Sequence, residues 1–235
     1  MKKSLTEILI EKTSDKNFNL NRSFKVEKNK TLEYLLIVDK NISSSASRSF
    51  VLEAGAELNS YRLFLEAKKG EIFNFNHEIK AGAKIASRSL IVGLKKENFS
   101  LKADYNFAGE KSFGRIKTEA LLANQAKLSA LANVNVLAAA QKSDTRVDMS
   151  LILDGSGVRG EVIPGLNISA NDVKAGHSAG TFRLKAEELF YLRSRGLSPE
   201  EIRRLFILSL VNNFTIGLSD KKIKEDIIKL IKKSL

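Results

Sequence analysis

The sequence predicts a mainly β protein, a parallel β-helix of stacked coils followed by a helical C-terminal segment. Three observations lead to this prediction. Apolar and polar residues alternate through most of the region 18–182, an Ala-Gly motif recurs every 27 residues, and signals for tight hairpins are scarce. We therefore expect an N-terminal helix at 1–17, a β-helix core at 18–182 and helices at 183–235.

The composition is that of a globular chain and excludes several kinds of site. The 235 residues are 43% hydrophobic and 28% charged. The absence of cysteine excludes a disulfide framework, a cysteine nucleophile and an iron–sulfur cluster held by this chain's own thiolates. Only two histidines occur, His77 and His177, so a multi-histidine metal site within one chain is not expected.

The first residues have the pattern of a short helix over 4–12. Ser4 and Glu7 have the spacing of a capping box, and Leu5, Ile8 and Leu9 would share one helical face. Two acidic residues of this segment, Glu7 and Glu11, argue against a signal peptide, because they interrupt the apolar run that such a peptide requires. The longest uncharged stretch, 205–219, is too short for a membrane span. We expect a soluble cytoplasmic protein.

Alternation with a period of two begins at about Phe18. It is clearest at 99–107, 134–138 and 147–153, where every second residue is apolar. Phe73, Phe75 and Ile79 share such a face with His77. We therefore expect His77 to be a core or interface histidine rather than a ligand.

The repeat begins at Ala54, Ala81 and Ala108, each followed by Gly, and the third copy is degraded. There is no Asn-Gly dipeptide and only one Asp-Gly, at 154–155, so two-residue hairpins are not indicated. One β-helix coil per repeat fits these features better than a sandwich of hairpins. The Ala and Val residues along 120–140 would suit a narrow interior.

Helical periodicity returns after Phe182. A helix over 184–195 should stop at Gly196, and the next begins at the cap Ser198, with Pro199 following and Glu201 completing a capping box. The predicted apolar face of this second helix consists of Ile202, Leu205, Phe206 and Leu210. A last helix at about 221–234 carries an apolar stripe, Ile223, Ile227, Leu230 and Ile231, opposite a lysine-rich face.

Two other classes of function are compatible with these features. A β-helix enzyme acting on polysaccharide needs clustered acids, but Asp104, Asp144 and Asp148 show no compelling pairing. The net charge of +12 and the basic last helix would allow a binder of nucleic acid or of a membrane surface. No aromatic residues are interleaved with the basic ones, which argues against nucleic acid. A basic helix of this kind more often packs its Ile stripe on a neighbour than on a membrane, so we expect neither partner.

The segment 164–196 carries an unusual series of motifs. It contains Pro164-Gly165-Leu166-Asn167-Ile168, then Asp172-Val173-Lys174-Ala175-Gly176-His177, then Leu189-Phe190-Tyr191-Leu192-Arg193-Ser194-Arg195-Gly196. Over 164–210 the chain resembles the SufB/SufD family, scaffold proteins of the SUF iron–sulfur cluster assembly system. The spacing from His177 to the Phe-Tyr-Leu run matches the family pattern without a gap. The resemblance implies a right-handed parallel β-helix, a single-stranded solenoid, with helices after it.

The chain departs from the family pattern at the cysteines. The family's Cys before the His is Ala175 here, and a second Cys of SufB-type members aligns with Val147. With no thiolate, the chain looks like a SufD-type subunit that supports a SufB-type partner. A transient iron–sulfur cluster at a heterodimer interface is then the only cofactor that the resemblance implies.

The resemblance also implies a role and partners. The role is that of a non-enzymatic scaffold that dimerises through the β-helix, as a homodimer or with a SufB-type paralogue. A SufC-type ABC ATPase would bind the C-terminal helices, through Leu189, Phe190, Tyr191, Arg193 and Arg195. His177 would lie at the dimer interface near the cluster-building site, as an iron ligand or as a hydrogen-bonding structural residue. The sequence leaves open which of these holds.

Overall fold

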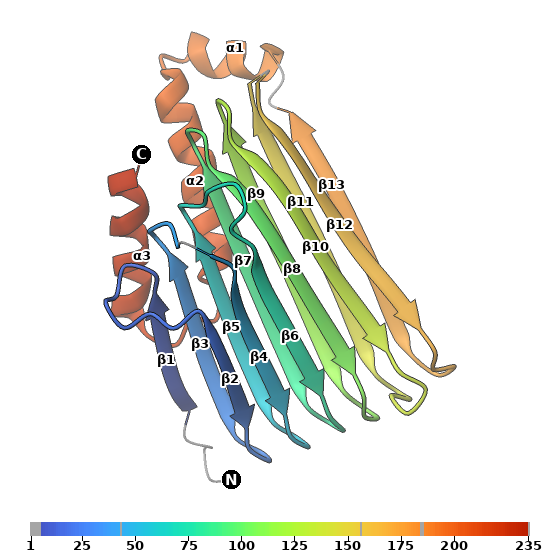
Figure 1. The fold of residues 1–235 in the computed structure, drawn as a ribbon. Coiled ribbons are helices and arrows are strands. Elements are labelled where there is room, and N and C mark those ends of the chain that lie inside the picture. The colour runs from blue at the N-terminus through green and yellow to red at the C-terminus, as the bar shows by residue number, and fades with distance from the viewer. Residues whose placement is uncertain (1–5, 43, 156, 184–185, 235) are drawn as a thin grey trace.

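A computed structural model describes residues 6–42, 44–155, 157–183 and 186–234, and its strands wind into a parallel β-solenoid of about six turns (Figure 1). Sheet A contains, in spatial order, β1 (Thr6–Lys12), β3 (Thr31–Val38), β5 (Glu57–Phe64), β7 (Lys84–Gly93), β9 (Phe113–Ala123), β11 (Asp144–Asp154) and β13 (Lys174–Arg183). Sheet B contains β2 (Asn21–Val26), β4 (Ala46–Leu52), β6 (Phe73–Ile79), β8 (Asn98–Phe107), β10 (Lys127–Val136) and β12 (Arg159–Ile168). Consecutive strands alternate between the sheets, and the neighbours in each sheet are parallel, as the β-helix prediction requires.

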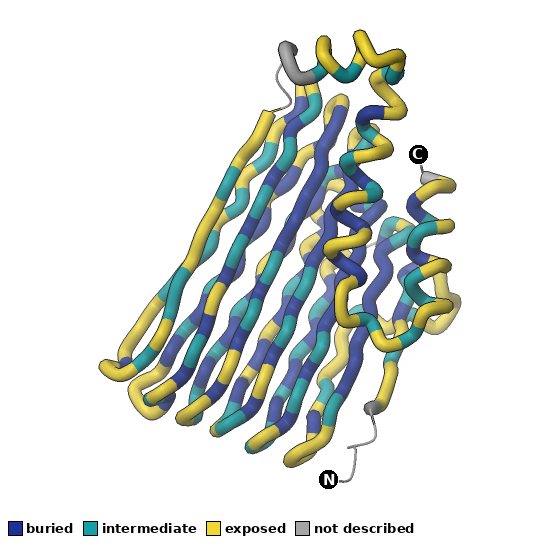
Figure 2. The backbone as a smooth tube through the Cα atoms, turned by 180° about the vertical axis from the view of Figure 1, so that it is seen from behind, coloured by how far each residue is buried: buried dark blue, intermediate teal, exposed yellow. Residues whose placement is uncertain are grey.

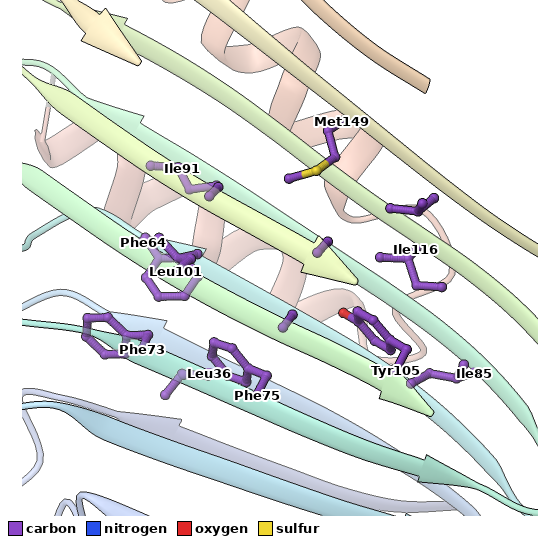
Figure 3. Packing of buried hydrophobic residues seen from close by; sticks show 14 of the residues in the cluster. Leu36, Phe64, Phe73, Phe75, Ile85, Ile91, Leu101, Tyr105, Ile116 and Met149 are labelled. Atoms are coloured by element: carbon purple, nitrogen blue, oxygen red, sulfur yellow. The ribbon is translucent and has the colours of Figure 1, made fainter. Parts of the chain in front are cut away.

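The core fills the space between the two sheets, where every second side chain of a strand points inward. In the first coils this interior is aromatic, and Figure 3 shows Phe64, Phe73, Phe75 and Tyr105 pointing between the sheets. Later it is lined by short side chains, Ala126, Ala130, Ala132 and Val134 among them, all buried. The prediction of small interior residues along 120–140 is therefore confirmed.

The sequence repeat corresponds to one turn at the same corner of each coil. Gly55 and Gly82 have φ of 68° and 65°, in the left-handed region that glycine adopts without strain. The N–H of Gly55 donates to the carbonyl of Ala81, one coil further on (2.9 Å). In the third copy this conformation belongs to Lys111 (φ 55°) rather than to Gly109, because the loop before it is longer. Gly109 has another reason to be glycine, since a Cβ there would lie 2.1 Å from the backbone nitrogen of Ala81.

The predicted N-terminal helix is wrong. Residues 6–12 form β1, which pairs in parallel register with β3 along its whole length. The short apolar pattern fits either structure locally, but only a strand covers the edge of β3 and turns Glu11 inward to meet the buried Arg48. Ser4, the predicted helix cap, lies outside the described residues.

Three helices follow the solenoid: α1 (Ala186–Ser194), α2 (Pro199–Phe214) and α3 (Lys221–Ser234). The predicted capping box of α2 is present, since Ser198 Oγ accepts from the N–H of Glu201 (3.2 Å) and the Glu201 carboxylate accepts from the N–H of Ser198 (2.7 Å). The predicted apolar face is partly wrong, because Leu205 is 53% exposed.

Helices α2 and α3 cover the outer face of sheet A (Figures 1 and 2). A second apolar cluster lies between them and the sheet, and it includes Leu35, Tyr61, Leu63, Leu90, Leu121, Ile207, Val211, Phe214, Ile227 and Ile231. Ile227 and Ile231 are fully buried in this cluster. The apolar stripe of α3, which would have to face the lipid in a membrane-bound helix, therefore packs on sheet A instead. No helix in the described part of the chain is long and apolar enough to cross a membrane.

Candidate functional site

The last coil of the solenoid forms the candidate site. β13 pairs only with β11 and β12 only with β10, so in the described residues each is the final strand of its sheet. The side chains of β12 and β13 are exposed or half-buried, whereas inward residues of β10 and β11 are buried, as Figure 2 shows. This end of the solenoid is therefore open, with unpaired strand edges and partly exposed interior residues.

His177 lies on β13 with its side chain exposed at this open end. Its Nδ1 is 3.1 Å from the carbonyl oxygen of Pro164, on β12 of the opposite sheet. Because a carbonyl oxygen can only accept, Nδ1 carries the proton of the neutral ring and Nε2 keeps the lone pair. Histidines that bind metals are commonly oriented by such a backbone carbonyl. His177 is thus arranged to offer one nitrogen ligand.

The structure brings the two cysteine-equivalent positions next to His177. Val147 of β11 is the register partner of His177, and Ala175 lies two residues before His177 on the same face. Neighbouring strands are about 4.8 Å apart, so all three positions belong to one small area. Val147 is fully buried and Ala175 half-buried, and neither can ligate a metal. In the part of the chain that the structure describes, no three His, Asp or Glu side chains gather as a metal site would require.

An ion-pair cluster that the sequence analysis missed lies on the outer face of the same strands. Asp148 accepts from the Ser178 hydroxyl (2.5 Å) and from Arg146 Nε (2.9 and 3.0 Å). Burial raises the pKa of Asp148, but the Ser178 and Arg146 hydrogen bonds outweigh it and leave this pKa below its usual value. The spacing of Asp148 and Ser178, one coil length, could have indicated the contact once the register was known.

The predicted partner-binding residues lie on and just after α1, which Figure 1 shows across one end of the two sheets. Phe190 and Tyr191 are 74% and 58% exposed, so neither packs on the solenoid. Arg195 stacks over the Tyr191 ring at 5.4 Å. Leu189 and Arg193 instead line a small hollow of about 90 Å³ against the start of α2.

An ion pair connects this helical region to the solenoid. Arg203 of α2 donates through Nε to Asp154, the last residue of β11 (2.6 Å). Both side chains are largely buried and both border the hollow beside α1. This ion pair holds α2 against the end of β11, and the exposed residues of α1 lie beside it.

Comparison with known proteins decides the family. The profile described as "SUF system FeS cluster assembly, SufBD core domain" matches residues 3–210. The chain belongs to the SufBD family. Similar SufBD relatives include the iron–sulfur cluster assembly protein SufD of Escherichia coli, 32% identical over 95 residues. SufBD family proteins of Mycobacterium leprae and Pyrococcus horikoshii are 36% identical over 90 residues and 26% over 156.

The matched regions cover 40%, 38% and 66% of this chain, respectively, and 22%, 23% and 34% of the three SufBD relatives. The chain therefore spans about a third or less of the length of the relatives it matches. The expectation that His77 is a core histidine agrees with its burial and with its stacking between the rings of Phe50 and Tyr105.

The acids that a polysaccharide-acting enzyme would need do not converge. Asp104 lies on β8 of sheet B, where it accepts from Asn133 (2.8 Å), while Asp144 and Asp148 lie on sheet A. Asp144 pairs with Arg115 (2.9 Å) and Asp148 with Arg146. Each of these carboxylates thus has its own hydrogen-bond or ion-pair partner. The three residues do not form the pair of acids that must flank the glycosidic bond to be cleaved.

Proposed function

We propose that this chain is a non-catalytic scaffold subunit of the SUF machinery. It joins a second scaffold chain through the open end of its solenoid and binds an ABC-type ATPase through its C-terminal helices. The observation that carries this proposal is the open end, where β12 and β13 leave strand edges uncovered among the described residues and His177 reaches between the sheets.

The iron–sulfur cluster is the cargo of the proposed assembly. His177 Nε2 supplies one ligand, and thiolates come from the second chain because this one has no cysteine. Two copies of this chain would offer imidazoles alone, a poor match for soft iron–sulfur chemistry. A heterodimer with a cysteine-bearing SufB-type chain therefore fits the proposal better than a homodimer.

The proposed contact with the ATPase uses α1. Phe190 and Tyr191 are large exposed aromatics beside Arg193 and Arg195, and aromatic and arginine side chains dominate the energetics of protein interfaces. Their exposure supports a role in binding over one in packing the solenoid.

The ligand role is tested with His177→Ala, and Thr181→Ala, an exposed change on the same strand, is the control. Each variant is purified with the SufB-type chain, and cluster formation is followed by absorbance after reconstitution with iron and sulfide. We expect His177→Ala to keep the partner but to yield less cluster, and Thr181→Ala to match the parent. An unchanged cluster yield contradicts the ligand role, and loss of the partner itself shows that His177 is structural.

The ATPase contact is tested by point substitutions rather than by truncation. Removing the chain after Phe182 would uncover the apolar outer face of sheet A. The double variant Phe190→Ala, Tyr191→Ala changes exposed residues only, and Leu205→Ala on α2 is a matched exposed control. We expect at least about tenfold weaker ATPase binding for the double variant alone, which is the loss of a hot spot worth about 1.4 kcal/mol. Equal binding by all three proteins rules out this contact.

A further inference from the structure

A basic groove lies at the corner of the solenoid where the strands of sheet A end and those of sheet B begin. It encloses about 500 Å³ and is lined by five cationic side chains, those of Lys68, Lys69, Lys96, Lys127 and Arg159. The other lining residues are Ala67, Asn98, Gln125 and Gly157, so no carboxylate among the described residues lines it. Within the described chain none of the five cations forms an ion pair.

Two of the carboxylates near the groove are hydrogen-bonded to loop backbone. Glu71 Oε2 accepts from the backbone N–H of Lys68 (3.0 Å), and Glu97 Oε2 accepts from that of Lys95 (2.8 Å). Both glutamates are buried, at 5% and 8% exposure. Their oxygens hold loop backbone, yet Glu71 and the neighbouring Glu66 lie close enough to Lys68 to offset part of its charge. The uncompensated charge of the groove is therefore greatest at Lys127 and Arg159.

The strand register places two of the cations directly beside each other. Lys127 of β10 and Arg159 of β12 are register partners, and on the other side of Lys127 the partner is the neutral Asn98. Like charges opposite each other on neighbouring strands destabilise a sheet. A bound anion would reduce this repulsion between two of the cations that line the groove, which is a further reason to expect one here.

The arrangement of the cations indicates the size of the anion. They come from four successive coils, and neighbouring strands of sheet B are about 4.8 Å apart, so the row is about 14 Å long. A single phosphate reaches the cations of one or two coils, whereas linked phosphates reach more. The described residues that line the groove include no aromatic side chain, so they offer no platform on which a base could stack.

We propose that this groove binds a small ligand with linked phosphate groups, such as tripolyphosphate or the triphosphate of a nucleotide whose nucleoside is not recognised. The groove shares β12 with the open end through Arg159 and contains no residue of α1. It is tested by calorimetry on the full chain with tripolyphosphate, ATP without magnesium, and inorganic phosphate, all at one ionic strength. We expect tripolyphosphate and ATP to bind within about threefold of each other and phosphate at least about tenfold more weakly.

Several results would overturn the proposal. They are the absence of saturable binding by tripolyphosphate, equally tight binding of inorganic phosphate, and a much higher affinity for ATP than for tripolyphosphate. A single-stranded thymidine oligonucleotide is included as a competitor. If it binds more tightly than tripolyphosphate and displaces it, the groove is a nucleic-acid site instead.

Variants then locate the binding. Lys127→Glu should weaken tripolyphosphate at least about tenfold without lowering the melting temperature of the free chain, because the new carboxylate faces Arg159. Lys221→Glu makes the same change of charge at an exposed residue of α3 outside the groove, and should bind almost as the parent does. Lys96→Gln, in a loop, tests the groove without touching the strands. Parent-like affinity in Lys127→Glu and Lys96→Gln, or equal weakening by Lys221→Glu, contradicts the proposal.

Discussion

The two ends of the solenoid differ in how the chain finishes them. At the first coils, the buried Arg48 donates through Nε to Glu11 (2.7 Å), and its other nitrogens donate to the carbonyls of Asn19 and Leu20. The loop between β1 and β2 is thereby fixed against the core, with Phe18 under the guanidinium group (4.9 Å). At the last coil no described segment plays this part, and His177 is exposed.

The two ends of this repeating fold therefore differ in how firmly the adjoining chain is anchored, and the proposed assembly uses the end that lacks such an anchor among the described residues. Solenoids need their terminal coils covered, because each coil buries its apolar face only against a neighbour. At the first end, called the closed end below, the loop between β1 and β2 is anchored on the buried Arg48, although in the described residues β1 and β2 also pair with one neighbour each and Ile8 and Ile10 are 41% exposed. The open end keeps Leu166 half-buried and Ile168 46% exposed, an arrangement that a second chain would complete.

The largest effect is expected at the closed end. Arg48→Ala leaves the carboxylate of Glu11 buried without its main partner, and breaking a buried ion pair costs roughly 3–5 kcal/mol. Urea denaturation measures the loss in free energy of unfolding. Arg22→Ala, which removes the half-exposed second partner of Glu11, is the control and should cost about 1 kcal/mol or less. Equal losses for the two variants would show that the buried network does not secure this end.

The buried histidine, His77, adds a test that depends on pH. Burial, with the nearby charge of Arg62, lowers the pKa of His77 to about 3. A folded pKa below the unfolded value of about 6.5 means that the neutral ring stabilises the fold above pH 6.5 and that this stability is lost as the pH falls from there toward 3. The expected slope is up to about 1.4 kcal/mol per pH unit, or about 2 kcal/mol between pH 6.5 and 5.

The matched variants for this test are His77→Phe and Thr181→Ala. Phenylalanine can keep the stacking between Phe50 and Tyr105, so we expect His77→Phe to flatten the dependence of unfolding free energy on pH. Thr181→Ala should leave that dependence unchanged, because it is an exposed change that removes no titratable group. A parent-like slope in His77→Phe would contradict the role assigned to the buried histidine.

A smaller effect is expected at the open end, and on association rather than on folding. Ile168→Glu places a charge on the exposed apolar edge of β12, and we expect at least about tenfold weaker binding of the second scaffold chain, or about 1.4 kcal/mol. Ile216→Glu, at an exposed apolar residue after α2, should leave binding unchanged. Size-exclusion chromatography and titration calorimetry measure the association. Identical affinities for these two variants would place the interface elsewhere.

The sequence predicts the interior of this fold well because its signals are local and repeated. The burial of His77 follows from a face it shares with Phe73 and Phe75, and the start of α2 follows from Ser198 and Glu201 alone. In the third copy of the repeat, the sequence pattern predicts the turn at Gly109, but the residue with the left-handed conformation is Lys111, two positions later. Nothing in the residue type indicated this.

What the sequence could not predict depends on contacts between coils. Residues 6–12 form a strand because they pair with β3 and because Glu11 binds the buried Arg48. Both of these partners are distant from the segment in the sequence. The basic groove is built from lysines and an arginine of four coils, which alignment by register brings together. For the candidate site, the family resemblance pointed to His177, but its bond to Pro164 required the structure.

The central claim is that the open end, and not the closed end, receives the second scaffold chain. Hydrogen–deuterium exchange of the full chain, with and without that partner, tests it most directly, since edge-strand amides are protected when the strand is covered. The account predicts slower exchange in peptides from β12 and β13 on binding, with no change in β1 and β2. Protection confined to β1 and β2, or none at β12 and β13 in a complex that demonstrably forms, would contradict it.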